Sequence, residues 1–305
     1  MYIGEEQVRA VLTYKELIPA IRQALIELSA GQVEQPPRTM LRAGNAEGAE
    51  NGWFALMPVL HREFMAVKTV TFYPANSELG LPTHMAVIEL LSRATGEPLA
   101  LMDGRLITEM RTAAVSAVAL DALAPPDVTS LGIFGSGVQA HSHLEALRLV
   151  RPGLIDIRIC SRKPENALRL AGECGGRACG SEEAAGCDVV LTATSSQTPV
   201  LEGRWLKTNC TILAVGAVGP QLRELDDEAA RSSWIVAESR ADVEREAGDL
   251  VLSGAAVQCE LGQILAEPVL LPAPKPSRIF FKSVGLAIED LTAARLVWAA
   301  SAPRR

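Results

Sequence analysis

The stretch Leu131-Gly132-Ile133-Phe134-Gly135-Ser136-Gly137-Val138-Gln139-Ala140 decides the fold of this 305-residue chain. An apolar run leads into a glycine-rich turn, and a helical pattern begins directly after the turn. Comparable apolar runs alternate with helical patterns further along, at residues 155–160, 188–192, 211–215, 234–237 and 278–281. Because such alternation is typical of buried parallel strands, we predict a doubly wound parallel α/β sheet.

The turn itself has the form G-x-G-x-x-A, which predicts a Rossmann-type dinucleotide site. Gly135 allows the tight turn, Gly137 lets backbone N–H groups approach a pyrophosphate, and Ala140 lets helix and strand pack closely. The helix N-terminus adds partial positive charge for the phosphates. The residues expected to contact the cofactor here are Gly135, Ser136, Gly137, Val138 and Gln139.

The tip of the next strand, Cys160-Ser161-Arg162-Lys163, indicates which cofactor is bound. An NAD site usually has an acidic residue there, whereas this chain has two cations. Arg162 can bind a 2′-phosphate through two hydrogen bonds, with Ser161 and Lys163 nearby, so we predict NADPH, with NADH possible. The alternative is a solvated loop. Thr192, Thr194 and Ser195 follow another strand and are expected to line the ribose or nicotinamide.

The N-terminal part differs in texture and predicts a smaller α+β domain. Thr13 and Glu16 have the spacing of a capping box before an amphipathic helix. Closely spaced strand-like runs follow and indicate an antiparallel sheet; they cover residues 53–57, 65–73, 84–91 and 99–102. An Ala-rich helix over 108–123 ends at Pro125-Pro126, where we place the boundary. The predicted domains are residues 1–124 with 286–305, and residues 125–285.

Composition excludes several classes of protein. The formal net charge of −7 argues against nucleic acid as a partner. The chain shows neither a secretory signal nor an apolar run that could span a membrane, so a cytoplasmic location is expected. Six cysteines without a C-x-x-C pair indicate reduced thiols, and four scattered histidines predict no metal site.

Segments along nearly the whole chain resemble the ornithine cyclodeaminase and mu-crystallin family of dinucleotide-binding proteins. The matching segments, in family order, are Lys68-Thr69-Val70-Thr71-Phe72-Tyr73, Pro82-Thr83-His84, Met102-Asp103-Gly104, residues 111–117, Gly135 to Ala140, Ala214-Val215-Gly216-Ala217, residues 223–228, Gly248-Asp249 and Phe281-Lys282-Ser283-Val284-Gly285. The resemblance implies a homodimer whose first domain binds a small imino- or amino-acid substrate and makes the subunit contact.

The resemblance also implies roles for individual residues. Arg38, Lys68 and Arg111 would grip the substrate carboxylate, and Thr83 and His84 would contact substrate and cofactor. Further cofactor contacts are expected from Val215 and Ser283, and further substrate contacts from Val218 and Val284.

The residues themselves agree with a carboxylate grip. Lys68 is a cation among strand formers, which is costly unless an anion meets it. Arg111 in the first turn of a helix opposes the helix dipole and also calls for a negative charge. The open alternative is an internal salt bridge, for example with Glu89 or Glu109, and His84 has the alternative of a structural hydrogen bond.

Val218 marks a departure from the cyclodeaminases, which carry a proton-exchanging Asp at this position. Valine cannot act as a general acid or base. We therefore predict an NADPH-dependent reductase of a cyclic ketimine carboxylate, Δ1-pyrroline-2-carboxylate or Δ1-piperideine-2-carboxylate, acting in proline metabolism. The alternatives are an ornithine cyclodeaminase, an amino-acid or N-alkyl amino-acid dehydrogenase, and a nucleotide-dependent binding protein for a small molecule.

Overall fold

The structure is a computed structural model that describes residues 1–44 and 50–302. The chain divides into two compact units: unit 1 contains Met1–Arg111 and Leu286–Arg305, and unit 2 contains Thr112–Gly285. The division lies inside one helix, α3 (Arg105–Leu123), and not at the prolines that end it. The second half of α3 belongs to unit 2, because the Ser116 hydroxyl, for example, hydrogen-bonds the His143 ring at 2.9 Å.

Unit 1 is built on a six-stranded sheet with the order β1-β6-β5-β4-β3-β2. Its strands are β1 (Tyr2–Ile3), β2 (Thr39–Gly44), β3 (Glu50–His61), β4 (Phe64–Phe72), β5 (His84–Ser92) and β6 (Pro98–Asp103). β2 to β6 pair antiparallel, and the short β1 joins the edge parallel to β6. Besides the first part of α3, the helical segments are α1 (Glu5–Val11), α2 (Tyr14–Ser29), η1 (Pro74–Leu79) and α11 (Ala287–Ser301).

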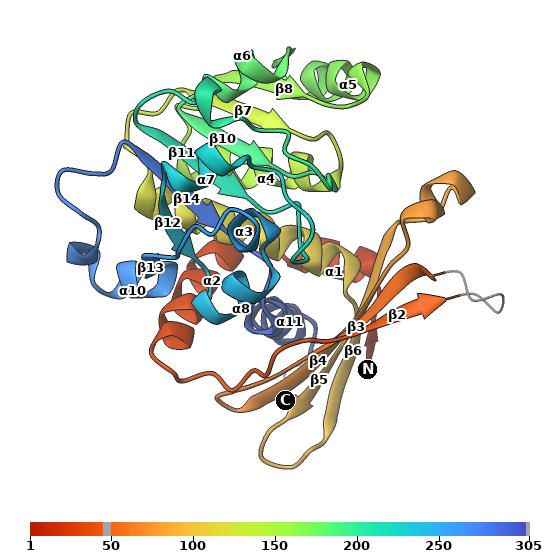
Figure 1. Cartoon of the computed structure of the whole chain (residues 1–305). Helices are drawn as coiled ribbons and strands as arrows, with labels where there is room; N and C mark the ends of the chain where they lie inside the picture. Colours follow the sequence, from red (N-terminus) through yellow and green to blue (C-terminus); the bar gives the residue numbers. More distant parts are fainter. Residues whose placement is uncertain (45–49, 303–305) are drawn as a thin grey trace. The chain divides into compact units, whose positions relative to one another are not determined.

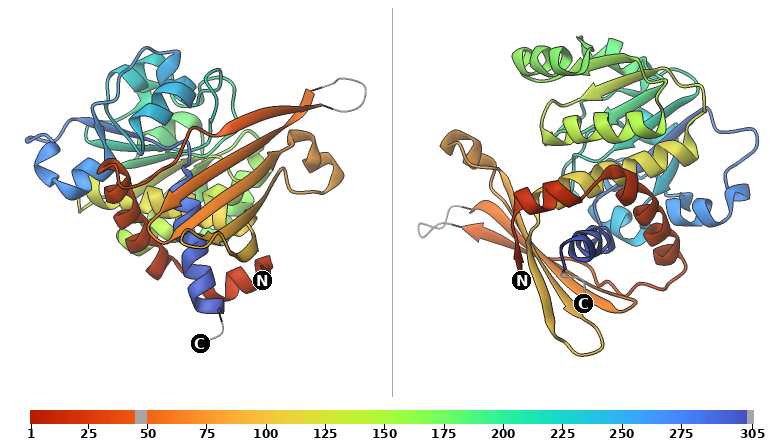
Figure 2. Two further views of the ribbon diagram at one scale, coloured as in Figure 1. Left: turned by 90° about the horizontal axis from the view of Figure 1, so that it is seen from below. Right: turned by 180° about the vertical axis from the view of Figure 1, so that it is seen from behind.

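The two faces of this sheet differ. On one face, Ile88, Leu90 and Met102 are fully buried, and α11 packs against β3, β4 and β5 as well as against α2 (Figure 2). Because side chains alternate across a strand, the neighbouring residues lie on the other face. That face carries exposed apolar side chains on β1, β5 and β6, namely Tyr2, Met85, Val87 and Leu101.

Unit 2 contains an eight-stranded parallel sheet in the order β13-β12-β14-β11-β10-β7-β8-β9, with helices on both faces (Figure 1). Its strands are β7 (Ser130–Phe134), β8 (Asp156–Cys160), β9 (Arg177–Ala178), β10 (Val189–Thr192), β11 (Cys210–Ala214), β12 (Trp234–Ala237), β13 (Cys259–Glu260) and β14 (Arg278–Lys282). The helical segments are α4 (Val138–Val150), α5 (Pro164–Cys174), α6 (Ser181–Ala185), η2 (Gly203–Trp205), α7 (Asp227–Arg231), α8 (Arg240–Glu246), α9 (Gly248–Val251), α10 (Leu261–Ala266) and η3 (Pro268–Leu270).

These sheets confirm the predicted fold class, a Rossmann-type parallel sheet with a smaller α+β unit. The central strands β7, β10, β11 and β14 are buried along their length or nearly so, which explains their continuous apolar runs. The strands β1, β9 and β13, each of two residues, were not predicted from the sequence, and neither was β2. The predicted capping box is wrong in detail: α2 begins after Thr13, but the Thr13 hydroxyl contacts the Glu16 carboxylate and caps no backbone N–H.

Candidate functional site

The glycine turn of unit 2 joins β7 to α4, and its geometry requires small residues at two positions. Gly135 has a φ of 116°, in the region that favours glycine. A Cβ at this position would also lie 2.5 Å from the carbonyl oxygen of Ala193. Ala140 is fully buried where the helix meets the sheet. In contrast, a Cβ at Gly137 would meet no protein atom within 4 Å, so packing inside the chain does not require glycine there.

The tip of β8 lies beside this turn. The hydroxyl groups of Ser136 and Ser161 are 2.8 Å apart and hydrogen-bonded. Arg162 and Lys163, the next two residues, are exposed. Lys163 is the residue directly before α5. In the described part of the chain neither cation forms a salt bridge, so both guanidinium and ammonium groups face solvent beside the predicted phosphate site.

The hydroxyl groups predicted to line the ribose or nicotinamide lie at the carboxyl edge of the sheet. Thr192 and Thr194 both donate to the carboxylate of Glu224, at 2.9 and 2.8 Å, and Ser195 is exposed. The hydroxyl protons of Thr192 and Thr194 therefore point to the buried Glu224 carboxylate. Burial raises the pKa of Glu224, and the nearby positive charge of Lys282 acts against this shift.

Four further predicted residues follow the neighbouring strands of unit 2. Val215 and Ser283 are buried, and their N–H groups donate to Thr192 and Ala214 carbonyls at 3.0 and 3.1 Å. Val218 is half-buried on the loop after β11. The N–H groups of Val284 and Gly285 both donate to Oε1 of Glu238 at 2.5 Å.

In unit 1 the structure brings Lys68, His84 and Arg111 into one cluster. Lys68 points to the helix-covered face of β4, where its Nζ lies 2.6 Å from Oδ2 of Asp290 on α11. Arg111 contacts two carboxylates of the same helix, Glu289 at 2.5 Å and Asp290 at 3.1 Å. All four charged side chains are at most 7% exposed. The cluster is therefore a buried, paired set of charges.

The internal salt bridge left open above is thus present, but with different partners. In the antiparallel register Lys68 lies opposite Ile88, so Glu89 projects from the other face of the sheet. Glu109, two residues from Arg111 on a helix, points to a different side of α3. Arg111 is also in the second turn of α3, which begins at Arg105, so the helix dipole opposes it less than the sequence implied.

Burial and neighbouring charges shift the pKa of two groups in this cluster. Burial, together with the charges of Arg111 and Arg38, lowers the pKa of Lys68 to about 8 against the effect of Asp290. Burial and the charges of Lys68 and Arg111 lower the pKa of His84 to about 4, with Asp290 alone acting in the other direction. His84 is therefore neutral at physiological pH, and the half-buried Arg38 lies within electrostatic range of Lys68. Thr83 precedes β5 and accepts a backbone hydrogen bond from Tyr73 at 2.8 Å.

Sequence reasoning missed the acidic half of the cluster. Glu289 and Asp290 lie in the first turn of α11, where carboxylates favour the helix dipole. In the sequence they resemble an ordinary charged helix start. Only their burial, at 0% and 2% exposure, shows that they belong to the site. Among the described residues no group of His, Cys, Asp and Glu has the arrangement of a metal site.

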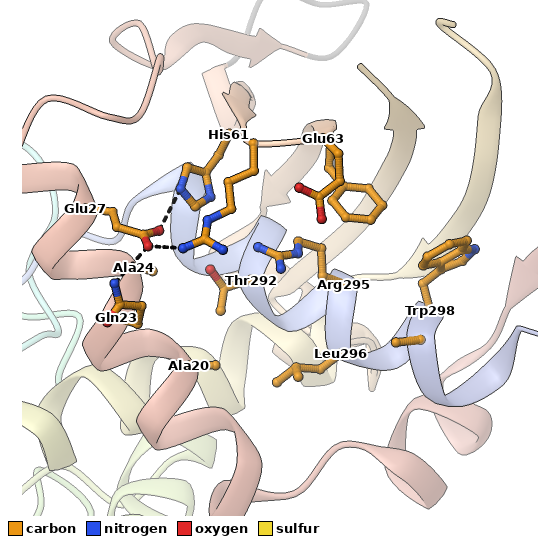
Figure 3. Close-up of a pocket in the computed structure, with 13 residues that line it drawn as sticks. Ala20, Gln23, Ala24, Glu27, His61, Glu63, Thr292, Arg295, Leu296 and Trp298 are labelled. Atoms are coloured by element: carbon orange, nitrogen blue, oxygen red, sulfur yellow. Dashed lines mark hydrogen bonds and ion pairs between the residues drawn. The ribbon is translucent and has the colours of Figure 1, made fainter. Parts of the chain in front are cut away.

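A cavity of about 340 Å³ lies elsewhere in unit 1, between α2, the β3–β4 turn and α11 (Figure 3). Glu27 occupies one end, where its carboxylate contacts Nε2 of His61 at 2.7 Å and also pairs with Arg62. Gln23 adds a hydrogen bond of 2.8 Å to the same carboxylate. None of the residues predicted to bind substrate or cofactor lines this cavity. Its charged groups tie the β3–β4 turn to α2.

Comparison with known proteins agrees with this architecture. The model of the ornithine cyclodeaminase/mu-crystallin family matches residues 2–302. The chain is 38% identical over 307 residues to ketimine reductase mu-crystallin of Mus musculus, covering 97% of this chain and 96% of the relative.

Two solved structures share the fold along nearly the whole chain. One is Δ1-pyrroline-2-carboxylate reductase of Thermococcus litoralis in complex with NADH and L-proline, with a TM-score of 0.90, 34% identity, and 98% and 96% of the two chains covered. The other is an archaeal alanine dehydrogenase dimer with bound NAD, with a TM-score of 0.90, 28% identity, and 98% and 95% covered. No helix in the described part of the chain has both the length and the apolarity needed to cross a membrane. With a parallel dinucleotide-type sheet, a buried Lys68–Arg111 cluster and these matches, the chain belongs to the ornithine cyclodeaminase/mu-crystallin family.

Proposed function

We propose that this protein is an NADPH-dependent reductase of cyclic ketimine carboxylates, such as Δ1-pyrroline-2-carboxylate and Δ1-piperideine-2-carboxylate. Unit 1 binds the substrate and unit 2 binds the dinucleotide. Relatives that carry the corresponding names, the mouse ketimine reductase and the archaeal pyrroline-carboxylate reductase, support this assignment.

The observation that carries the substrate class is the electrostatic environment of His84. Burial and two buried cations, Lys68 and Arg111, lower the pKa of this residue, and the carboxylate of Asp290 opposes them. A small anion beside His84 would be stabilised there, because charge interactions are strong away from water. The carboxylate of an imino acid is such an anion. The positive charge of Arg38 acts on Lys68, and Arg38, Thr83 and Val284 are proposed as further substrate contacts.

The cofactor side is supported by space and by charge. A side chain at Gly137 would be tolerated by the chain itself, so the glycine serves close approach of a ligand to the backbone. Exposed Arg162 and Lys163 beside the turn suit a 2′-phosphate, which NADPH has and NADH lacks. The remaining proposed cofactor contacts are His84, Ser136, Val138, Gln139, Ser161, Thr192, Thr194, Ser195, Val215 and Ser283.

The reaction needs little acid chemistry from the protein. When bound, NADPH would supply the hydride that reduces C2 of the protonated imine, and L-proline or L-pipecolate and NADP⁺ would result. Because the iminium is already electrophilic, Val218 need not supply a proton. The chain's contribution is to hold the carboxylate and to exclude competing orientations.

The test is a panel of substrates with purified protein. NADPH oxidation with either cyclic ketimine, with an equal amount of L-proline or L-pipecolate formed, is the expected result. Turnover of pyruvate with ammonia or methylamine instead would identify an amino-acid or N-alkyl amino-acid dehydrogenase. Ammonia release from ornithine with NAD⁺ would identify a cyclodeaminase. Cofactor binding without oxidation by any imine would indicate a binding protein and refute the proposal.

We also propose a homodimer formed through the exposed apolar face of the unit 1 sheet. Tyr2, Met85, Val87 and Leu101 form a continuous patch there, which a second copy would cover. The alanine dehydrogenase structure of a dimer supports this occupant. Val87→Lys should convert the dimer to a monomer in light-scattering measurements, whereas a monomeric wild-type protein would refute the proposed dimer.

Six free cysteines favour a reducing, cytoplasmic location.

A further inference from the structure

One carboxylate, that of Glu224, bridges two loops at the carboxyl edge of the unit 2 sheet. From the loop after β10, Thr194 donates its N–H and its hydroxyl to Oε1, at 2.6 and 2.8 Å. Oε2 accepts from the Thr192 hydroxyl at 2.9 Å and, in the loop after β11, from the N–H groups of Gly216 and Ala217 at 2.9 and 3.2 Å. The side chain is fully buried. The two loops therefore share one hydrogen-bond acceptor.

Two further buried charges hold this carboxylate in place. The backbone N–H groups of Glu224 and Leu225 donate to Oδ1 of Asp249, at 2.7 and 2.9 Å. Oδ2 of Asp249 lies 2.9 Å from Nζ of Lys282, and Lys282 donates to the carbonyl of Ala217 at 2.8 Å. Asp249 and Lys282 are both fully buried. The N–H and the carbonyl of Ala217, the residue before Val218, are therefore both held by hydrogen bonds to buried charged groups.

The arrangement requires a carboxylate of this length. All five groups around Glu224 are donors, so an amide would turn its own N–H groups against some of them. The Glu224 carboxylate also packs directly against the backbone of Gly216, because a Cβ at Gly216 would lie 2.5 Å from Oε1 of Glu224. A shorter acid would keep the negative charge but could accept only some of these hydrogen bonds from the same backbone position.

We propose that Glu224 is a positioning residue that sets the loop carrying Thr194 and the loop carrying Val218 in fixed relation to each other, and thereby shapes the nicotinamide end of the cofactor site. The proposal rests on the function proposed above for the location of that site. It gives a role to Arg223–Glu228, a segment that resembles the family but for which the sequence predicted no contact. Glu224 touches no reacting atom and acts through the loops.

Asp188 provides a matched control at the opposite edge of the same sheet. It precedes β10, and its Oδ2 accepts from the N–H groups of Thr129 and Ser130 at 2.9 Å each and from the Ser130 hydroxyl at 2.7 Å. It also pairs with Lys207. Asp188 therefore ties β7 to β10 with the same kinds of bond, but at the amino edge, where parallel sheets do not bind ligands.

The experiment compares Glu224→Gln, Glu224→Asp and Asp188→Asn in the full-length protein. Thermal unfolding is measured for each, together with the Kd of NADPH by fluorescence titration and the kcat and KM of ketimine reduction. We expect Glu224→Gln to raise the Kd of NADPH at least about tenfold and to lower kcat about 10²-fold. Glu224→Asp, which keeps the charge, should show the same changes in smaller size. Asp188→Asn should lower the unfolding temperature and leave Kd and kcat within about twofold of wild type.

The outcomes separate this proposal from the proposed function. If no imine is reduced, the Kd of NADPH still tests the role of Glu224. An unchanged Kd and kcat in a folded Glu224→Gln or Glu224→Asp protein would overturn the proposal. So would equal losses of binding in Asp188→Asn, since the effect would then follow stability and not loop position. Glu224→Asp keeps the test available should Glu224→Gln not fold.

Discussion

The two units each bury a group of charges, and the groups differ in how they are balanced. In unit 2, Glu224 is enclosed by five donors from its own chain, and the Asp249–Lys282 pair beside it is complete. In unit 1, Lys68 and Arg111 meet Asp290 and Glu289, and burial together with the charges of Lys68 and Arg111 lowers the pKa of the neighbouring His84 to about 4. The first group holds backbone segments in place, whereas the second is the one that we propose to bind the substrate carboxylate. Burial of charge alone therefore does not identify a ligand site.

The largest expected effect breaks the balance in unit 1. Asp290→Asn removes the partner that Lys68 and Arg111 share, and leaving buried cations uncompensated costs about 3–5 kcal/mol of unfolding free energy. The double variant Lys68→Met with Asp290→Asn should recover much of this loss. Urea unfolding measures both. The exposed Arg169–Glu173 pair is the control: Glu173→Gln should leave the midpoint unchanged. Equal midpoints for wild type and Asp290→Asn would show that the cluster is not an ion-pair network.

The next effect tests the anion attraction directly. Lys68→Met or Arg111→Met should raise the KM of the ketimine about 10²-fold, because each removes a charged hydrogen bond of roughly 3 kcal/mol from the carboxylate. The KM of NADPH should stay the same, since unit 2 is untouched. Steady-state kinetics with each substrate varied separately provide the measurement. Wild-type KM values in both variants would remove the carboxylate grip from the mechanism.

Unit 2 offers a contrast between its enclosed and its exposed charges. Arg162→Ala should raise the KM of NADPH about tenfold and leave that of NADH nearly constant, because only NADPH carries the 2′-phosphate. Arg169→Ala on α5 removes an exposed guanidinium that is already paired with Glu173, and serves as control. A parallel change for both cofactors would mean that Arg162 does not distinguish them.

The smallest effect concerns pH. Lys68 has a pKa of about 8 in the folded protein, so it loses its charge as the pH rises through that value. Binding of a carboxylate by the protonated form should weaken roughly fourfold between about pH 7 and about pH 8.5. Pyrrole-2-carboxylate is a suitable probe, because its ring nitrogen does not titrate in this range. An inhibition constant that is flat across this range in wild type would show that Lys68 stays charged or does not contact the carboxylate.

The comparison also shows what sequence could predict. Central strands and the glycine turn depend on local patterns, and β7, β10, β11 and β14 lie where apolar runs indicated them. Lys68 and Arg111 were expected to need a negative charge, and they have one. Its source was not predictable, because Asp290 is far along the chain and only the tertiary fold brings α11 onto β4. Glu224 was equally hidden, since three of its five donors belong to Thr192 and Thr194, 32 and 30 residues earlier in the chain.

The position of α11 in the chain has a consequence for the order of folding. Unit 2 is continuous from Thr112 to Gly285, whereas unit 1 needs Leu286–Arg305 to be complete. During synthesis, Lys68 and Arg111 therefore cannot pair with Asp290 and Glu289 until all of unit 2 has been made. Unit 2 can fold first, and α11 then pairs its two carboxylates with Lys68 and Arg111 in a late step of folding.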